Sequence, residues 1–199
     1  LGGTDIVIGL RGRQQRVHIA LPGMHNILNA MAAAATGLAM DIDPETIAAG
    51  IESATFPGMR SEIIVSEGLT IIDDSYNANP ASMKAALDML AAAPHENKIA
   101  VLGDMLELGQ ESERFHAQLG AWAAQTRIDH LVLTGAFAPV VAEAAKTAGM
   151  DAKSISIAPA LEDIQAALDQ LLADEAIVLV KASRGLRLDR VVGYLKAVA

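Results

Sequence analysis

The sequence predicts an α/β fold: a Rossmann-like, doubly wound, mostly parallel sheet that is preceded by a β-hairpin and two helices. From residue 58 onward, short apolar runs alternate with segments of helical periodicity. This alternation is typical of parallel strands joined by right-handed crossovers. Aromatic residues make up only 3% of the chain. The core must therefore be built from Ala, Leu, Ile, Val and Met, which suits helices packed on a sheet.

Composition narrows the class of protein. The 199 residues are 52% hydrophobic, which is enough for one or two domains with a real core. The net charge of −9 argues against nucleic acid or an anionic membrane surface as the main partner, since both select basic patches. The absence of cysteine excludes disulfides and thiolate metal sites, and it is compatible with a reducing cytoplasm. The longest apolar run, residues 27–40, is short and interrupted by Asn29 and Thr36, so we expect a buried helix and no membrane insertion.

The first 57 residues predict a small helix-on-hairpin unit. Two apolar runs, 5–10 and 17–21, are joined by a basic turn and predict the hairpin. Two helices are expected to follow, over residues 24–40 and 45–53. Asp43 is the expected N-cap of the second helix. Because this segment is small and one-sided, we expect it to be the remainder of a domain that begins upstream.

A Pro/Gly break at Phe56-Pro57-Gly58 is the expected boundary, which gives domains 1–57 and 58–199. Beyond it we expect six strands, over residues 62–66, 70–73, 98–102, 130–134, 154–157 and 176–180. Helices fill the gaps. Apolar stripes at helical spacing begin at Met83, Phe115, Leu161 and Leu188.

The stretch 71–80 carries the clearest local signal. An apolar strand runs into Asp73 and Asp74, and then Asn79 and Pro80 are suited to be the N-cap and the first residue of a helix. Ligands of open α/β sheets bind between a strand's carboxyl end and a helix N-terminus. The alternative interpretation is a capped turn with solvated acids.

Other polar residues follow the remaining predicted strands and should share the same sheet edge. They are Asp73, Asp74 and Asn77, then Gly103 and Asp104, then Thr134 and Gly135, and finally Lys181, Ser183 and Arg184. Lys181 and Arg184 suit a phosphate, and Asp74 suits ribose hydroxyls. This edge therefore predicts a site for a nucleotide-like polyanion.

A second polar group lies at the start of the Ala-rich helix. Asn26 and Asn29 are three residues apart, hence on one helix face, and their amides can both donate and accept, as a purine edge requires. Capping of the helix by Asn26 is the alternative. The histidine spacing shows no metal-site pattern, so we expect no metal ligands in this chain. No Gly-x-x-x-x-Gly-Lys-Ser/Thr loop occurs either, so an ATP site here would be only partial.

Four stretches together resemble the Mur ligases of peptidoglycan synthesis, in particular the members that add D-Ala-D-Ala. They are His25–Ala30, Asp73–Pro80, Gly103–Gly109 and Lys181–Arg184. The resemblance spans nearly the whole chain in the right order. It implies three domains, for the UDP-sugar, for ATP with a P-loop, and a Rossmann-like C-terminal domain. The chain is similar to the end of the central ATPase domain plus the whole C-terminal domain.

The resemblance also implies roles for individual residues. Adenine and ribose or phosphate contacts fall to His25, Asn26, Asn29, Arg60 and Asp74. The catalytic group near the phosphates and the acyl intermediate would be Lys181, Ser183 and Arg184. Asn77 and Asp104 would border the dipeptide site. Ala182 departs from the family's Lys-Gly-Ser-Arg pattern, and this would be costly if the position needs a positive φ.

The implied reaction is amide ligation through an acyl phosphate. ATP phosphorylates the terminal carboxylate of UDP-N-acetylmuramoyl-tripeptide, and the amine of D-Ala-D-Ala then attacks. The resemblance implies Mg²⁺ with ligands upstream of this chain, the missing N-terminal and central domains as partners, and a cytoplasmic location. The chain alone is expected to be inactive. Two alternatives are a receiver-like phosphoacceptor domain, weakened because Thr134-Gly135-Ala136 offers no acceptor Asp after its strand, and a non-catalytic nucleotide-binding module.

Overall fold

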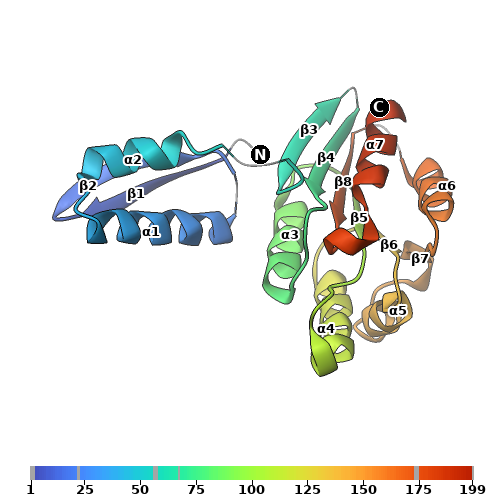
Figure 1. Cartoon of the computed structure of the whole chain (residues 1–199). Helices are drawn as coiled ribbons and strands as arrows, with labels where there is room; N and C mark the ends of the chain where they lie inside the picture. Colours follow the sequence, from blue (N-terminus) through green and yellow to red (C-terminus); the bar gives the residue numbers. More distant parts are fainter. Residues whose placement is uncertain (1–2, 22, 56–57, 67, 173–174, 199) are drawn as a thin grey trace. The chain divides into compact units, whose positions relative to one another are not determined.

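The computed structural model describes residues 3–21, 23–55, 58–66, 68–172 and 175–198, apart from the side chain of His25. The chain forms two compact units, Leu1–Pro57 and Gly58–Ala199 (Figure 1). The expected boundary residues Phe56 and Pro57 lie outside the described residues. Each unit has its own hydrophobic core and is described by itself.

The first unit is a β-hairpin covered by two helices. Its elements are β1 (Thr4–Leu10), β2 (Arg13–Ile19), α1 (Met24–Ala39) and α2 (Pro44–Glu52). The hairpin is antiparallel, and β2 begins four residues before the apolar run that starts at Val17. The reason is a two-residue turn at Arg11 and Gly12, whose φ values of 48° and 77° are both positive, as the tightest hairpin turns require. Arg13 and Arg16 therefore lie in the strand and not in the turn.

The starts of the two helices differ. Asp43 caps α2 as expected: its Oδ1 accepts a hydrogen bond of 2.9 Å from the Thr46 amide, and the bonds from Thr46 lower the pKa of the Asp43 carboxyl. The first helix instead begins after Gly23, which has φ of 109° and provides no side-chain cap. Asn26 lies inside the first turn of α1. The alternative that Asn26 is the N-cap was therefore wrong.

The second unit contains a six-stranded sheet. Its strands are β3 (Glu62–Ser66), β4 (Leu69–Asp74), β5 (Asn97–Leu102), β6 (His130–Leu133), β7 (Ile155–Ile157) and β8 (Ala176–Lys181). Every strand lies within one residue of its expected bounds. The spatial order is β3-β4-β8-β5-β6-β7, with β3 antiparallel to β4 and all other pairs parallel. The predicted mostly parallel sheet is confirmed.

Helices cover both faces of this sheet (Figure 1). They are α3 (Pro80–Ala92), α4 (Ser112–Gln125), α5 (Ala138–Thr147), α6 (Leu161–Leu171) and α7 (Asp189–Val198). The core on one face joins α3, α4 and α5 to alternate strand residues such as Ile72 and Leu102. The core on the other face joins α6 and α7 to their neighbours, such as Ile71 and Val101. Strands buried on both sides explain the continuous apolar runs in the sequence.

The order of the strands determines where a ligand site can form. The chain passes from β4 through α3 to β5, and much later β8 inserts between these two strands. The carboxyl ends of β4, β8 and β5 therefore lie side by side. The connections cover opposite faces, since α3 belongs to one core and α6, which leads into β8, to the other. A reversal of this kind opens a crevice at the strand ends, where ligands of such sheets bind.

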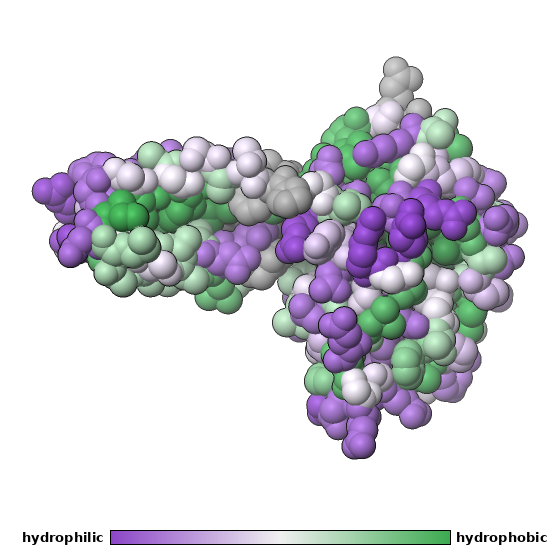
Figure 2. All heavy atoms as spheres, in the orientation of Figure 1, coloured by the Kyte–Doolittle hydropathy of each residue, from purple (hydrophilic) through white to green (hydrophobic). Residues whose placement is uncertain are grey.

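Apolar side chains also reach the surface of the first unit. Figure 2 shows hydrophobic residues along this unit between α1 and α2. Met24, Leu28 and Met31 recur at helical spacing on α1, and each is more than half exposed. Such a stripe is typical of a helix face that packs against another element. In the part of the chain that the structure describes, no helix is long and apolar enough to cross a membrane.

Candidate functional site

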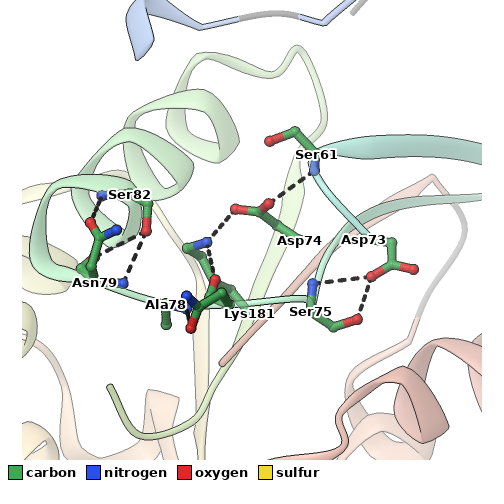
Figure 3. Close-up of polar contacts among 9 residues, drawn as sticks. Ser61, Asp73, Asp74, Ser75, Ala78, Asn79, Ser82 and Lys181 are labelled. Atoms are coloured by element: carbon green, nitrogen blue, oxygen red, sulfur yellow. Dashed lines mark hydrogen bonds and ion pairs between the residues drawn. The ribbon is translucent and has the colours of Figure 1, made fainter. Parts of the chain in front are cut away.

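The centre of the sheet edge is an ion pair between neighbouring strands. Asp74, the last residue of β4, is the register partner of Lys181, the last residue of β8. The Nζ of Lys181 lies 2.5 Å from Asp74 Oδ2 and also donates to the carbonyl oxygen of Asn77 at 2.9 Å (Figure 3). Lys181 is only 1% exposed. Burial lowers the pKa of the Lys181 ammonium, Asp74 opposes this effect, and the charge of Arg60 adds to it.

The other oxygen of Asp74 holds the segment that leads into β3. Its Oδ1 accepts a hydrogen bond of 2.9 Å from the Ser61 amide (Figure 3). Ser61 and Met59 have left-handed φ values of 51° and 67°, and Arg60 lies between them. The Arg60 guanidinium lies 4.3 Å from the centre of the Tyr76 ring, a cation–π contact. The structure therefore brings Arg60 close to the end of β4, together with Asp74.

Asp73 faces away from this pair, as the alternation of a strand requires. It is 3% exposed, and its Oδ1 accepts hydrogen bonds from the backbone amide and the hydroxyl of Ser75, at 3.1 and 2.6 Å (Figure 3). Burial raises the pKa of the Asp73 carboxyl, while the bonds from Ser75 oppose the rise. Asp73 therefore shapes the turn after β4 and takes no part in the ion pair.

Asn79 starts α3 as predicted. Its Oδ1 accepts from the Ser82 amide at 2.9 Å, and the Ser82 hydroxyl accepts from the Asn79 amide at 3.1 Å (Figure 3). This is a reciprocal capping box, and Pro80 is the first helical residue. The capped helix fixes the backbone that runs from Asp74 to Asn79.

A pocket of about 400 Å³ lies beside the ion pair. It is lined by Tyr76, Asn77, Ala78, Asn79, Leu106, Glu107, Leu108, Ser183, Arg184 and Gly185. These residues follow β4, β5 and β8, the three strands whose carboxyl ends meet. Three of the predicted ligand-contacting residues, Asn77, Ser183 and Arg184, line this one pocket. Lys181 adjoins it through the carbonyl oxygen of Asn77.

Ser183 and Arg184 occupy different places in the pocket wall. Ser183 is buried, and its Oγ accepts a hydrogen bond of 2.8 Å from the Leu106 amide. It thereby joins the loop after β8 to the loop after β5. The Arg184 side chain is about half exposed, with Nη1 lying 3.2 Å from Asp189 Oδ1 and 3.4 Å from Met59 Sδ. Its cation is available to a ligand at the pocket rim.

Asp104 lies in the same loop but does not line the pocket. It is 6% exposed, and its carboxylate accepts backbone hydrogen bonds of 2.8 and 3.0 Å from Ala136 and Phe137. Gly135 is required there, because its φ is 100° and a Cβ would lie 2.5 Å from the Asp104 carboxylate. The structure therefore shows Asp104 fixing the loop between β6 and α5, apart from Asn77.

His116 follows Phe115 on α4 and is a buried polar residue beside the same loop. It is fully buried, and its Nε2 accepts a 2.9 Å hydrogen bond from the Met105 amide. An accepting Nε2 places the proton on Nδ1, which donates to the Ser112 carbonyl oxygen at 2.7 Å. The ring stacks on Phe137 at 4.3 Å. His116 thereby anchors the loop that lines the pocket, a role that a single helical stripe does not reveal.

The residues expected on the adenine side lie in the first unit. Asn26 and Asn29 both line a pocket of about 440 Å³ between α1 and α2. The remaining lining is mostly apolar, and Asn26 is 6% exposed. An apolar slot with two amides at one end suits a flat heterocyclic base. The side chain of His25 lies outside the described residues.

Ala182 is accommodated without strain. It is not among the residues with positive φ, and it is fully buried. Space for it comes from Gly103, where a Cβ would lie 2.8 Å from the Ala182 Cβ and 2.6 Å from Leu186 Cδ2. Ala182 would be costly only if its position needed a positive φ, and this condition is not met. The fold also places a glycine opposite the alanine.

The charged groups of the site suit an anion better than a metal ion. Lys181, Arg184 and Arg60 supply three cations near the end of β4. Over the described ranges, no group of three or more His, Cys, Asp or Glu side chains could hold a metal ion. Phosphate oxygens are what such cations bind, and Arg can do so with two parallel bonds.

Comparison with known proteins shows the family. The sequence profile described as "Mur ligase, glutamate ligase domain" matches residues 59–184. A relative from Bacillus subtilis is 37% identical over 192 residues, covering 96% of this chain and 41% of the relative. One from Escherichia coli is 34% identical over 197 residues, covering 98% and 42%. Both are named UDP-N-acetylmuramoyl-tripeptide–D-alanyl-D-alanine ligase.

Solved structures agree. A crystal structure of MurF from Acinetobacter baumannii matches 98% of this chain and 42% of its own, with a TM-score of 0.86 and 28% identity. MurF from Thermotoga maritima, solved with ADP, shares the fold at a TM-score of 0.78 and 24% identity. The chain thus spans about two fifths of the length of the relatives it matches. The receiver-like and non-catalytic alternatives find no support among these matches, and the chain belongs to the Mur ligase family.

Proposed function

We propose that this chain provides part of an ATP-dependent ligase that adds D-Ala-D-Ala to UDP-N-acetylmuramoyl-tripeptide in peptidoglycan synthesis. The names of the relatives support the reaction. The observation that carries the proposal is the sheet edge, where the Asp74–Lys181 pair adjoins a pocket lined by Asn77, Ser183 and Arg184. Cations, an amide and a hydroxyl there suit a phosphorylated intermediate beside an amine substrate.

In this proposal the residues of the site have separate roles. ATP supplies the phosphoryl group that activates the tripeptide carboxylate as an acyl phosphate, which the dipeptide amine attacks. Lys181 and Arg184 stabilise the negative charge that grows on the oxygens during this attack. The hydroxyl of Ser183 accepts from the Leu106 amide and keeps its own hydrogen for an anionic oxygen. Asn77 contacts the amine substrate. Asp104 contributes by fixing the neighbouring loop.

Each unit is proposed to carry residues that contact the nucleotide. Asp74 and Arg60 bind ribose and phosphate, and Asn26 and Asn29, with His25, bind adenine. We assign residues 1–57 to the remainder of a central ATP-binding domain and residues 58–199 to the C-terminal ligase domain. The N-terminal and central domains are the proposed partners, and they supply the P-loop and the Mg²⁺ ligands. Because the reaction consumes ATP, we propose a cytoplasmic location.

A titration tests the substrate assignment. Calorimetry of the 199-residue chain compares its binding of three candidate amines, which are D-Ala-D-Ala, L-alanine and L-glutamate. The proposal expects binding of D-Ala-D-Ala in preference to both amino acids. Preference for a single amino acid, or no binding of any of the three, overturns it. The chain alone is also expected not to turn over ATP, since its sequence contains no Gly-x-x-x-x-Gly-Lys loop.

A further inference from the structure

The pocket after β4, β5 and β8 has one acidic group in its lining. Glu107 is the sole carboxylate, and Arg184 is the sole cation, among the residues that line it. Leu106, Leu108 and Tyr76 supply apolar wall, and Leu106 and Tyr76 keep 44% and 38% of their surface exposed. A small apolar-walled pocket with one charge of each sign suits a small molecule with a charged end group.

Glu107 adopts a backbone conformation that glutamate rarely adopts. Its φ is 65°, in the left-handed region, and Gly109 follows two residues later with φ of 57°. A left-handed non-glycine residue is strained, and the surrounding structure must hold it in place. Such outliers concentrate at ligand sites, so the conformation of Glu107 is itself a pointer to function.

The backbone on the N-terminal side of Glu107 is held at two successive amides. The Met105 amide donates to the buried ring of His116 at 2.9 Å, and the Leu106 amide donates to Ser183 Oγ at 2.8 Å. Gly185 allows the loops to approach closely, because a Cβ there would lie 2.9 Å from Leu106 Cδ1. These contacts fix the backbone that carries the Glu107 side chain at the pocket.

The two charges of the pocket are not equally satisfied. Arg184 has a carboxylate partner in Asp189, at 3.2 Å. Glu107 makes no ion pair or side-chain hydrogen bond with any residue that the structure describes. The pocket charge without a partner among these residues is therefore an exposed carboxylate, and the ligand group that complements it is a cation that can donate hydrogen bonds.

We infer that Glu107 binds the ammonium group of the amine substrate and so selects a peptide with a free amino terminus. This inference rests on the proposed function and adds a specificity-determining residue to it. An ammonium held at Glu107 would share the pocket with Arg184, which in the proposed function binds the acyl phosphate. Leu106 and Leu108 offer the apolar surface that methyl side chains of an alanyl dipeptide can contact.

Calorimetric titration of the whole chain tests this inference with two ligands and two proteins. The ligands are D-Ala-D-Ala and N-acetyl-D-Ala-D-Ala, which lacks the ammonium group. The proteins are wild type and Glu107→Gln. A charge-assisted bond predicts that the substitution weakens D-Ala-D-Ala binding about tenfold or more. Acetylation should weaken wild-type binding by a similar factor, and the substitution should then cause no further loss.

Two further variants control for folding and for net charge. Glu107→Gly suits the left-handed backbone, so it should fold normally and still lose affinity. Glu96→Gln removes an exposed carboxylate before β5, at the opposite end of that strand, and should bind as wild type does. Equal affinity of wild type and Glu107→Gln for D-Ala-D-Ala overturns the inference and leaves the proposed function intact. Failure of wild type to bind D-Ala-D-Ala overturns both.

Discussion

Asp74 and Lys181 are 107 residues apart in the chain, yet they are register partners at the ends of β4 and β8, with Nζ 2.5 Å from Oδ2. The two side chains of this ion pair differ in their exposure and in their other partners. The Lys181 side chain is 2% exposed and the Asp74 side chain 14%. Asp74 has a second partner in the Ser61 amide, whereas the other contact of Lys181 is the carbonyl oxygen of Asn77. Loss of Asp74 therefore leaves a buried cation without a counter-charge.

This asymmetry predicts which half of the pair matters more for stability. Asp74→Asn should destabilise the second unit by about 3–5 kcal/mol, the usual effect of leaving a buried charge unpaired. Lys181→Met should cost less, about 1–3 kcal/mol, because Asp74 keeps the Ser61 amide and some contact with water. Urea unfolding at neutral pH gives both free energies. Equal losses, or a larger loss for Lys181→Met, would contradict the assignment of Lys181 as the more deeply buried charge.

Asp74→Asn should also change the pH dependence of stability. Burial already lowers the pKa of Lys181 below the ordinary lysine value of 10.5, and Asp74 is the group that raises it. Without Asp74 the pKa falls further. Between this folded pKa and 10.5 the unfolded chain binds the proton and the folded chain does not, so stability rises with pH in that range. The deficit of Asp74→Asn should therefore shrink between pH 7 and pH 10 in urea titrations. A deficit that stays constant would contradict this.

Asp73→Asn should stabilise the protein at neutral pH. Burial raises its pKa, and Glu62 stands directly opposite on β3 and adds to the rise. Asp73→Asn keeps an oxygen for the two bonds from Ser75 but removes the charge. Because the folded pKa is raised, the ionised carboxylate costs stability above it, and the cost vanishes below the unfolded value of 3.8. The variant should unfold at a higher temperature than wild type at pH 7. The gain should be absent near pH 3, and a loss at pH 7 would contradict this reasoning.

Replacing His116 should lower both the stability of the protein and its affinity for the substrate. His116→Phe preserves a ring to stack on Phe137 but leaves the Met105 amide without its acceptor. An unsatisfied buried amide should cost about 1–3 kcal/mol of stability. The loop that carries Glu107 should also loosen and weaken D-Ala-D-Ala binding in calorimetry. His130→Phe, at the partly exposed start of β6, serves as the control. Similar effects of the two substitutions would argue against a specific anchoring role.

Gly103 and Ala182 should be energetically coupled. Gly103→Ala places a Cβ 2.6 Å from Leu186 Cδ2 and 2.8 Å from Ala182 Cβ, so it should cost about 1–3 kcal/mol through overpacking. Ala182→Gly removes one of these contacts, so the double variant should lose less than the sum of the two single losses. Thermal unfolding of all four proteins measures the coupling. Strictly additive losses would show that the two positions do not share space.

Much of the second unit could be predicted because its sequence signals are local. Buried parallel strands appear as continuous apolar runs, and the Asn79-Pro80 pair marks the start of α3 through the chemistry of its own side chains. The hairpin was less predictable. Arginine rarely occupies a left-handed turn position, so the positive φ of Arg11 and the early start of β2 left no mark in the pattern.

The contacts between distant segments could not be predicted for a different reason. The Asp74–Lys181 pairing depends on β8 entering between β4 and β5, which the path of the connections decides and no local pattern encodes. His116 and Glu107 were missed in the same way. Helical periodicity does not say which loop lies opposite a buried ring, and only the structure shows that Glu107 lines the pocket with a left-handed backbone.

The pocket at the carboxyl ends of β4, β5 and β8 is the proposed site of the amine substrate. Two-dimensional ¹H–¹⁵N NMR of the 199-residue chain, titrated with D-Ala-D-Ala, tests it most directly. We predict saturable shifts concentrated in residues 76–79, 105–109 and 183–185, the segments that line or anchor the pocket. L-Ala-L-Ala should produce weaker shifts of the same amides. Saturable shifts that avoid these three segments, or no saturable shifts at all, would contradict the claim.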